Sequence, residues 1–228
     1  MLTKTFRAAL LAASVVAGFA HAEAPAAVIR GTLRVPAGSE KKTSVANPYP
    51  GRAGSMPPAE VRRGALQDAL IWIEGPTPAG RPPDSLFATA RTGQLAQKDQ
   101  SFSPRVVPVA VGGQIEFPNR DPIYHNVFSV SPAKRFDLGK YGRGKSKSVR
   151  FDKPGVVKVY CDIHSNMEGF IVVVPNGWFT RVADDGSFEL PPLPSGTYRV
   201  QAWHPDLGTK SVSVTVAEDE TRSIEVAF

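Results

Sequence analysis

Short apolar runs separated by turn-forming residues dominate this chain and constrain its fold more than any other feature. The sequence contains 20 glycines and 21 prolines, which are residues that end strands and form turns. Patterns typical of helices are nearly absent. Many short strands at this spacing predict an all-β chain built of antiparallel β-sandwiches or barrels. The predicted strands cover residues 27–35, 66–74, 105–111, 114–117, 126–130, 148–151, 156–161, 170–174, 198–203, 210–216 and 223–228.

The first residues have the pattern of a secretory signal. Lys4 and Arg7 precede a small and apolar run over 8–20, and residues 20–22 read Ala-His-Ala, the small-x-small pattern of a cleavage site. The run is shorter than the ~20 apolar residues that span a bilayer, and no later stretch is long and apolar enough. We therefore predict a cleaved signal over residues 1–22, export to the periplasm and no membrane span.

Composition divides the remaining chain into parts. Residues 36–64 are rich in Pro, Gly, Ser, Ala and charge, with little to bury, and predict a flexible insert. Residues 177–228 are few for an independent core. We therefore expect strands at 27–35 and 66–74 to complete this smaller β-sandwich. A central domain over 87–175 is then inserted between its two halves.

The single cysteine, Cys161, needs a chemical reason in an exported protein. It cannot form an intramolecular disulfide, so it is either buried and inert, exposed and reactive, or bound to a metal. Strand alternation over 157–161 points Cys161 toward the core at the end of a strand. His164 and Met167 follow at intervals of three residues, and His125 lies beside an earlier strand. One thiolate, two imidazoles and a weak thioether form the ligand set of a trigonal copper site with a long axial bond.

Other sites that use cysteine fit this sequence less well. A structural zinc site requires four strong ligands, and methionine is a poor one. Covalent haem attachment needs a C-x-x-C-H motif, a binuclear copper centre needs a second cysteine, and a multicopper oxidase needs many more histidines. A cysteine hydrolase places its nucleophile at a helix start or sharp turn, whereas Cys161 ends a strand. A buried small residue beside a loop stays open as the alternative.

The segments "HNVFS" and "CDIHSNM" resemble the cupredoxin family. The Cys-x-x-His-x-x-Met spacing is most similar to amicyanin, and the longer stretches over 87–175 resemble plastocyanin-like proteins of the methylamine-utilisation type. The resemblance implies a Greek-key β-sandwich that holds one mononuclear type 1 (blue) copper ion near one end. The ligands that it implies are His125, Cys161, His164 and Met167.

The resemblance also implies a role for Asn126, which directly follows the first histidine. In that role Asn126 braces the ligand loop, and its backbone N–H points at the thiolate sulfur and lowers its electron density. One position departs from the family pattern: many relatives carry proline after the second histidine, whereas here Ser165 follows His164. The family's tuning of the copper potential therefore does not transfer to this loop.

The C-terminal part resembles a second kind of module. The segment "GWFTRVADDGSFELPPLPSGTYRVQAWHPDLG" is similar to the carboxypeptidase regulatory-like or transthyretin-like β-sandwich. Such a module is a structural or binding platform, and this resemblance implies no catalysis. Within it, Asp184 and Asp185 precede Gly186 and predict a hairpin turn. We expect His204 to hydrogen-bond a turn rather than to bind a metal.

The chain is basic, with a formal net charge of +6 at pH 7. In an exported protein this favours an acidic partner over nucleic acid, which that compartment seldom offers. Basic residues concentrate over 134–158, where only Asp137 and Asp152 oppose them. The stretch is either a docking face for an acidic redox partner or a set of solvated strand edges guarded by lysine. Its basic members are Lys134, Arg135, Lys140, Arg143, Lys145, Lys147, Arg150, Lys153 and Lys158.

These observations predict a monomeric, exported copper protein that transfers single electrons between redox partners. A site closed by four protein ligands leaves no position for a substrate, so we expect no enzymatic activity. Two alternatives belong to other classes. One is a copper carrier or sensor, and the other is a binding or scaffold protein whose copper site is vestigial.

Overall fold

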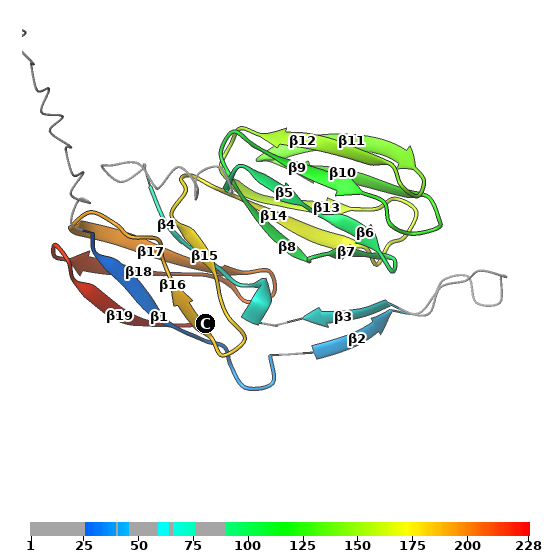
Figure 1. Ribbon diagram of the computed structural model, residues 1–228. Coiled ribbons are helices and arrows are strands. Elements are labelled where there is room, and N and C mark those ends of the chain that lie inside the picture. The colour runs from blue at the N-terminus through cyan, green and yellow to red at the C-terminus, as the bar shows by residue number, and fades with distance from the viewer. Residues whose placement is uncertain (1–25, 40, 46–58, 64–65, 76–89) are drawn as a thin grey trace, which may run out of the picture.

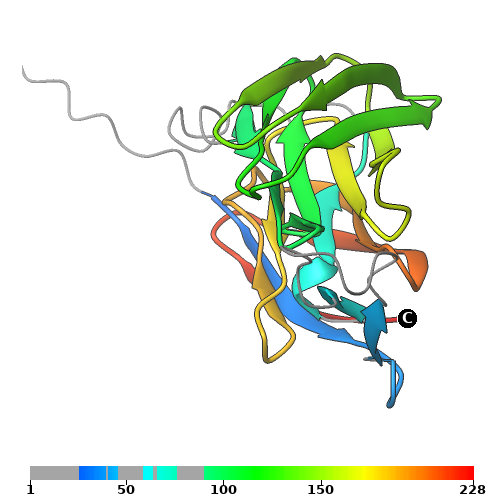
Figure 2. The ribbon, with the colours of Figure 1, turned by 90° about the vertical axis from the view of Figure 1, so that its right-hand side faces the viewer.

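The computed structural model describes residues 26–39, 41–45, 59–63, 66–75 and 90–228 of the chain. These residues form two β-sandwiches, so the predicted all-β fold class is confirmed (Figure 1). A view turned by 90° shows the green and yellow central sandwich above the blue, orange and red one (Figure 2). The predicted signal over 1–22 lies outside the described residues. Within the described part, no helix has the length and apolar character needed to cross a bilayer.

The central sandwich contains a five-stranded sheet and a three-stranded sheet. The larger sheet has the order β11-β10-β13-β14-β8, and the smaller one has the order β12-β9-β5. Pairing is antiparallel except where β8 joins β14 and β5 joins β9. The strands are β5 (Thr92–Gln94), β8 (Val106–Ala110), β9 (Gly113–Pro118), β10 (His125–Ser131), β11 (Lys134–Tyr141), β12 (Ser146–Phe151), β13 (Gly155–Tyr160) and β14 (Glu168–Val174), with a short hairpin of β6 (Ala96–Lys98) and β7 (Ser101–Ser103).

Strand alternation fills the core between these two sheets. In β13, Val157 and Val159 are buried while their neighbours Lys158 and Tyr160 are half-buried on the opposite face. Aromatic and branched side chains of the facing sheet complete the core, as with Phe117 of β9. Cys161 continues the alternation of β13 and is buried in the same cluster.

The second sandwich combines strands from both ends of the chain. One sheet has the order β16-β1-β19 and the other β15-β4-β17-β18. β1 pairs in parallel with β19, and β4 pairs with β15 and β17, so the segments before the central sandwich complete the sheets of the segments after it. The strands are β1 (Val28–Arg34), β4 (Leu70–Ile73), β15 (Phe179–Arg181), β16 (Ser187–Glu189), β17 (Gly196–His204), β18 (Gly208–Val216) and β19 (Thr221–Ala227), and a short 3-10 turn η1 (Leu66–Asp68) precedes β4.

Part of the predicted flexible insert, 36–64, forms a two-stranded ribbon. β2 (Lys41–Val45) pairs antiparallel with β3 (Ala59–Arg63). The segments read Lys-Lys-Thr-Ser-Val and Ala-Glu-Val-Arg-Arg, which carry too few apolar residues to show the alternation that predicts a strand. Backbone pairing of this kind does not depend on an apolar face, so the sequence pattern missed it. Residues 46–58 lie outside the described part.

The two sandwiches share an apolar interface along β14. All residues of β14 after Glu168 are buried, because one face lies in the central core and the other packs against the second sandwich. The ring of Phe170 meets that of Trp203 from β17 edge-on, with centroids 5.6 Å apart. Burial on both faces explains why β14 reads as a continuous apolar run rather than an alternating one.

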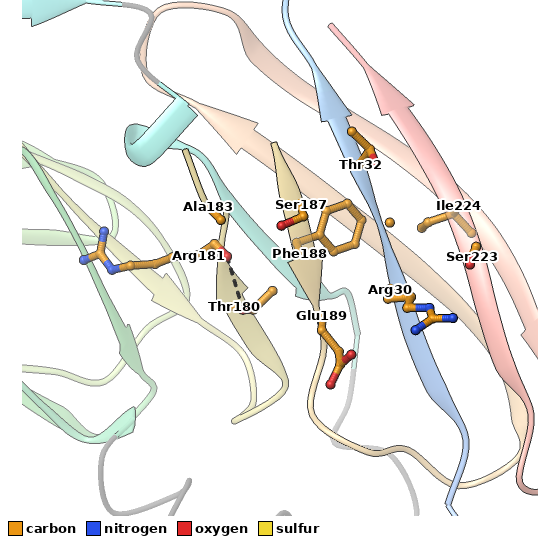
Figure 3. Close-up of a pocket in the computed structure, with 11 residues that line it drawn as sticks. Arg30, Thr32, Thr180, Arg181, Ala183, Ser187, Phe188, Glu189, Ser223 and Ile224 are labelled. Atoms are coloured by element: carbon orange, nitrogen blue, oxygen red, sulfur yellow. Dashed lines mark hydrogen bonds between the residues drawn. The ribbon is translucent and has the colours of Figure 1, made fainter. Parts of the chain in front are cut away.

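Arg181 adds a polar contact between the sandwiches. A hollow of about 550 Å³ lies between β15, β16, β1 and β19, and Arg30 and Glu189 are among the residues that line it. Figure 3 shows the Arg181 side chain extending from β15 away from this hollow. Its Nη2 donates to the carbonyl oxygen of Val106 in β8 at 2.7 Å.

Gly31 of β1 offers a test of packing in the second sandwich. A Cβ at this position would lie 2.2 Å from the Ile224 carbonyl oxygen and 2.8 Å from the Phe188 ring. We expect Gly31→Ala to lower the free energy of unfolding by about 2 kcal/mol, because relief of the overlap requires the paired backbone of β19 at Ile224 to shift. Urea unfolding followed by tryptophan fluorescence measures this change.

Gly196→Ala is the matched control, because a Cβ there would meet only the Tyr198 ring at 3.4 Å. Both substitutions restrict the unfolded chain equally, so their difference reports the folded state. Equal losses of stability in the two variants would contradict the packing described for β1.

Candidate metal centre

The candidate ligands come together at one end of the central sandwich. β13 ends at Tyr160, which pairs with Glu168 at the start of β14, and the intervening loop 161–167 carries three of the four predicted ligands. The fourth, His125, is the first residue of β10, the strand beside β13. The close pairing of β10 with β13 therefore brings a residue distant in sequence next to the loop.

Three donor atoms converge in this corner. Nδ1 of His125 lies 3.0 Å from Nδ1 of His164 and 3.9 Å from Sγ of Cys161. Nδ1 of His164 lies 3.8 Å from Sγ of Cys161. All three residues are buried: His125 is 0% exposed, Cys161 4% and His164 7%. Both imidazoles thus present the same ring nitrogen toward the thiol.

The separations fit a single trigonal ion. A metal bound about 2.0 Å from each imidazole nitrogen and about 2.3 Å from a thiolate, in a trigonal arrangement, puts the nitrogens about 3.5 Å apart and each about 3.7 Å from the sulfur. The two nitrogen–sulfur distances of this site, 3.9 and 3.8 Å, are close to that value, and the nitrogen–nitrogen distance of 3.0 Å is shorter than the trigonal one. A soft thiolate with two imidazoles is a donor set that suits copper.

Met167 is the last residue of the ligand loop, and its side chain lies in the core. Its side chain is almost fully buried and belongs to the same apolar cluster as Cys161. Its backbone N–H donates to the carbonyl oxygen of His164 at 3.0 Å, which folds the loop back on itself. The structure thus gathers His125, Cys161 and His164 at their donor atoms and places Met167 in the cluster that contains the thiol.

Asn126 contacts the sulfur and a neighbouring strand. Its backbone N–H lies 3.4 Å from Sγ of Cys161, and its side-chain amide donates to Asp137 of β11 at 2.7 Å. The Asp137 carboxylate also accepts the Gly139 N–H, and these bonds lower the pKa of Asp137. Asn126 therefore ties the end of β10 both to the thiol and to β11.

Asp121 is a residue of the candidate site that the sequence analysis missed. Its Oδ2 lies 2.7 Å from Nε2 of His125, the ring nitrogen that faces away from Cys161. The backbone N–H groups of Asp99 and Gln100 donate to the two oxygens of the same carboxylate at 2.7 and 2.9 Å. A carboxylate behind a ligand histidine sets its tautomer and ring orientation. The spacing Asp-x-x-x-His in "RDPIYH" was the available signal.

Electrostatic interactions within the site shift the pKa of all three candidate donors. Burial opposes ionisation of Cys161, but hydrogen bonds from His125 and backbone N–H groups outweigh it and lower the thiol pKa. Burial also disfavours the charged form of His125, yet hydrogen bonds to Asp121 and Cys161 raise its pKa overall. Burial and the charge of His125 lower the pKa of His164. A metal that binds here requires a thiolate and neutral imidazoles, so the lowered pKa values of Cys161 and His164 favour its uptake and the raised pKa of His125 opposes it.

His204 lies in the second sandwich, away from this site. It is buried, and its Nδ1 accepts the backbone N–H of Asp206 at 3.1 Å, which confirms the turn hydrogen bond predicted for it. Asp68, His204 and Asp206 form a second group of potential ligand atoms. The guanidinium of Arg105 already binds both carboxylates of that group, so it is an ion-pair cluster.

Comparisons with known proteins find solved structures that are similar to part of this chain. A scan against protein-family models finds no match, and a comparison with curated proteins finds none either. A copper-containing nitrite reductase from Thermus scotoductus is 29% identical with a TM-score of 0.35, over 36% of this chain and 22% of that one. A purple cupredoxin from Nitrosopumilus maritimus is 24% identical with a TM-score of 0.33, over 36% and 98%. Amicyanin from Paracoccus versutus is 18% identical with a TM-score of 0.34, over 45% and 96%. The carboxypeptidase regulatory-like resemblance of the C-terminal part stays a prediction.

The contact of Asp121 with His125 predicts a measurable effect on metal affinity. In Asp121→Asn the amide keeps the shape of the side chain but removes the negative charge that orients and polarises the imidazole. We expect copper affinity to fall by about 10- to 100-fold, measured by competition with a chelator of known affinity. Asp137→Asn is the control, since Asp137 contacts no predicted ligand other than through Asn126; an equal loss in both variants would contradict the role of Asp121.

Proposed function

We propose that this protein is an exported type 1 copper protein that transfers single electrons between redox partners. The convergence of two imidazole nitrogens and one thiol within 3.9 Å, all buried at one end of a β-sandwich, carries this proposal. A bound copper ion supplies reversible one-electron chemistry at this position. The ligands that the chain offers to it are His125, Cys161, His164 and Met167.

Residues around the donors support electron transfer because they limit movement. Asp121 holds the ring of His125 through Nε2, and the Asn126 N–H draws electron density from the sulfur. The apolar cluster around Cys161 and Met167 keeps water away and leaves little space for rearrangement. A site whose ligands stay in place in both oxidation states loses little energy to reorganisation when an electron arrives or leaves.

The same burial argues for a carrier of electrons rather than an enzyme. His125, Cys161 and Met167 are nearly inaccessible, and His164 is 7% exposed. Four side chains from the protein occupy the ligand positions of such a site. A substrate then has no position at the metal, so an electron enters and leaves through the protein edge nearest the ligands.

The exposed surface beside the site is basic. β11 runs toward the site, and its Lys140 pairs with Asn126 in register, while Arg143 and Lys145 follow in the turn that Asn119 holds by two backbone hydrogen bonds. Tyr124, which precedes His125, is exposed and packs near this turn at Gly142. A basic surface with an exposed aromatic residue suits the docking of an acidic redox partner, because complementary charge accelerates the encounter. Lys134, Arg135 and Lys153 lie at the other end of the sandwich.

Copper addition to the metal-free full-length protein tests the proposed site. We expect Cu(II) to produce an intense visible sulfur-to-copper absorption band at one equivalent, because the thiolate is a direct ligand. Cys161→Ser should abolish the band while the far-ultraviolet circular dichroism stays unchanged. A colourless or pale product with the unsubstituted chain would contradict the proposal. An intense band combined with negligible electron exchange would indicate a copper carrier instead.

Surface charge near the site predicts a second, kinetic effect. We expect the double variant Arg143→Glu and Lys145→Glu to slow oxidation of the reduced copper form by hexacyanoferrate(III), an anionic oxidant, about tenfold at low ionic strength. Stopped-flow absorbance measures the rate, and added salt should remove the difference. The control is the double variant Arg135→Glu and Lys153→Glu, which changes net charge equally at the far end. Equal slowing in both pairs would mean that net charge, rather than this surface, governs the encounter.

A further inference from the structure

The loop that carries three of the predicted ligands has a short and well-defined stem. Tyr160 of β13 and Glu168 of β14 are the last paired residues before the loop, so Cys161 and Met167 directly follow and precede this pair. Any shift of β14 along or away from β13 at this point moves Met167 relative to Cys161. The position of Glu168 therefore matters for the geometry of the ligand set.

Glu168 is held by two cations from the central sandwich. Its Oε1 accepts from Nη2 of Arg105 at 3.1 Å, and its Oε2 lies 3.0 Å from Nζ of Lys158. The side chain of Glu168 is 17% exposed. The backbone of Arg105 adds a further bond, because its carbonyl oxygen accepts the Phe170 N–H at 2.8 Å. The first residues of β14, directly after the ligand loop, are thus anchored on Arg105.

Arg105 is in turn held by the second sandwich. Its Nη1 donates to Asp68 at 2.9 Å, and its two terminal nitrogens donate to the two oxygens of Asp206 at 2.8 and 3.0 Å. Asp68 belongs to η1 before β4, and Asp206 lies in the turn between β17 and β18. The side chain of Arg105 is only 9% exposed. A guanidinium presents its donors in a rigid fork, so these contacts fix its orientation as well as its charge.

Apolar contacts run alongside this network. The guanidinium carbon of Arg105 lies 5.3 Å from the centre of the Phe170 ring, and Lys158 lies 5.4 Å from the same ring. Trp203 of the second sandwich packs edge-on against Phe170. Phe170, the third residue after the ligand loop, therefore contacts two cations and an aromatic ring of the second sandwich.

We infer that the second sandwich positions the copper-ligand loop, with Arg105 as the positioning residue that connects the two. The network joins Asp206 and Asp68 to Arg105, Arg105 to Glu168, and Glu168 by the chain itself to Met167. This inference rests on the proposed copper site, and it assigns to the second sandwich a role in holding Met167 at its distance from the other donors. It requires no ligand of its own in that sandwich.

Two variants break this network at different points. Asp206→Ala removes the bidentate contact from the second sandwich and leaves the Arg105–Asp68 and Arg105–Glu168 pairs in place. Arg105→Gln removes the centre of the network. Arg105→Lys restores the charge but not the fork. The control is Arg34→Gln, which breaks an exposed ion pair with Glu225, 2.7 Å long, within the second sandwich.

The first measurement uses the metal-free full-length chain. Hydrogen exchange followed by NMR reports the opening of the Met167 N–H, which donates to His164 within the loop. We expect exchange about tenfold faster in Asp206→Ala and in Arg105→Gln, partial recovery in Arg105→Lys, and no change in Arg34→Gln. The N–H groups of Val157 and Val159 in the core should exchange at unchanged rates in all of them.

The second measurement uses the copper-loaded chain. We expect the relative intensities of the visible sulfur-to-copper bands, and the reduction potential, to shift in Asp206→Ala but not in Arg34→Gln, because the position of the axial methionine affects both. Unchanged exchange at Met167 together with an unchanged spectrum would overturn the inference. Arg105 would then only hold the two sandwiches together, without an effect on the ligand loop. If Arg105→Gln fails to fold, Asp206→Ala decides alone. Absence of any intense band in the unsubstituted chain would refute the proposed function, while the exchange measurement would still decide the coupling.

Discussion

The architecture depends on one strand, β14, which is buried on both faces. Its inner face closes the central core and its outer face packs against the second sandwich through Phe170, Val172 and Val174. The ligand loop ends where this strand begins, at Glu168. Because β14 packs in both sandwiches, it lies between the second sandwich and the candidate metal centre of the central one. The chain order, with strands of the second sandwich before and after the central one, keeps the two together.

Electrostatic interactions at the centre follow from burial. A thiol and two imidazoles that are buried away from water need hydrogen-bond partners. The Asn126 N–H is a partner of the sulfur, and the Asp121 carboxylate is a partner of His125. Asp121 is itself held by backbone N–H groups of the β6–β7 turn. The hydrogen bonds around the candidate donors therefore come from separate segments of the chain: the start of β10, the loop before it that carries Asp121, and the β6–β7 turn. Removing any one segment leaves a buried polar group unsatisfied.

Much of the fold was predictable because strand alternation is local. The all-β class and the strands around 106–110, 155–160 and 196–204 follow from patterns of apolar residues. Strands such as β11, with its lysines and Asp137, escaped prediction since an edge strand exposes more polar residues. Among the residues of the candidate site and its surroundings, the roles proposed for Asp121 and Arg105 were missed. Nothing local distinguishes a carboxylate or a guanidinium that will be buried from one that will be solvated.

The sequence by itself determined the all-β character of the chain and the chemical identity of the candidate ligands, because both depend on residue type and spacing within short segments. His164 and Met167 are close to Cys161 along the chain, so their proximity needed no fold. Only the tertiary structure decided that Nδ1 of His125 lies near the thiol and that Asp121 lies behind His125. It also decided that Arg105 contacts both Glu168 and Asp206, the second of which is 101 residues away in sequence. These contacts link segments far apart in sequence, and strand pairing and sandwich packing alone bring them together.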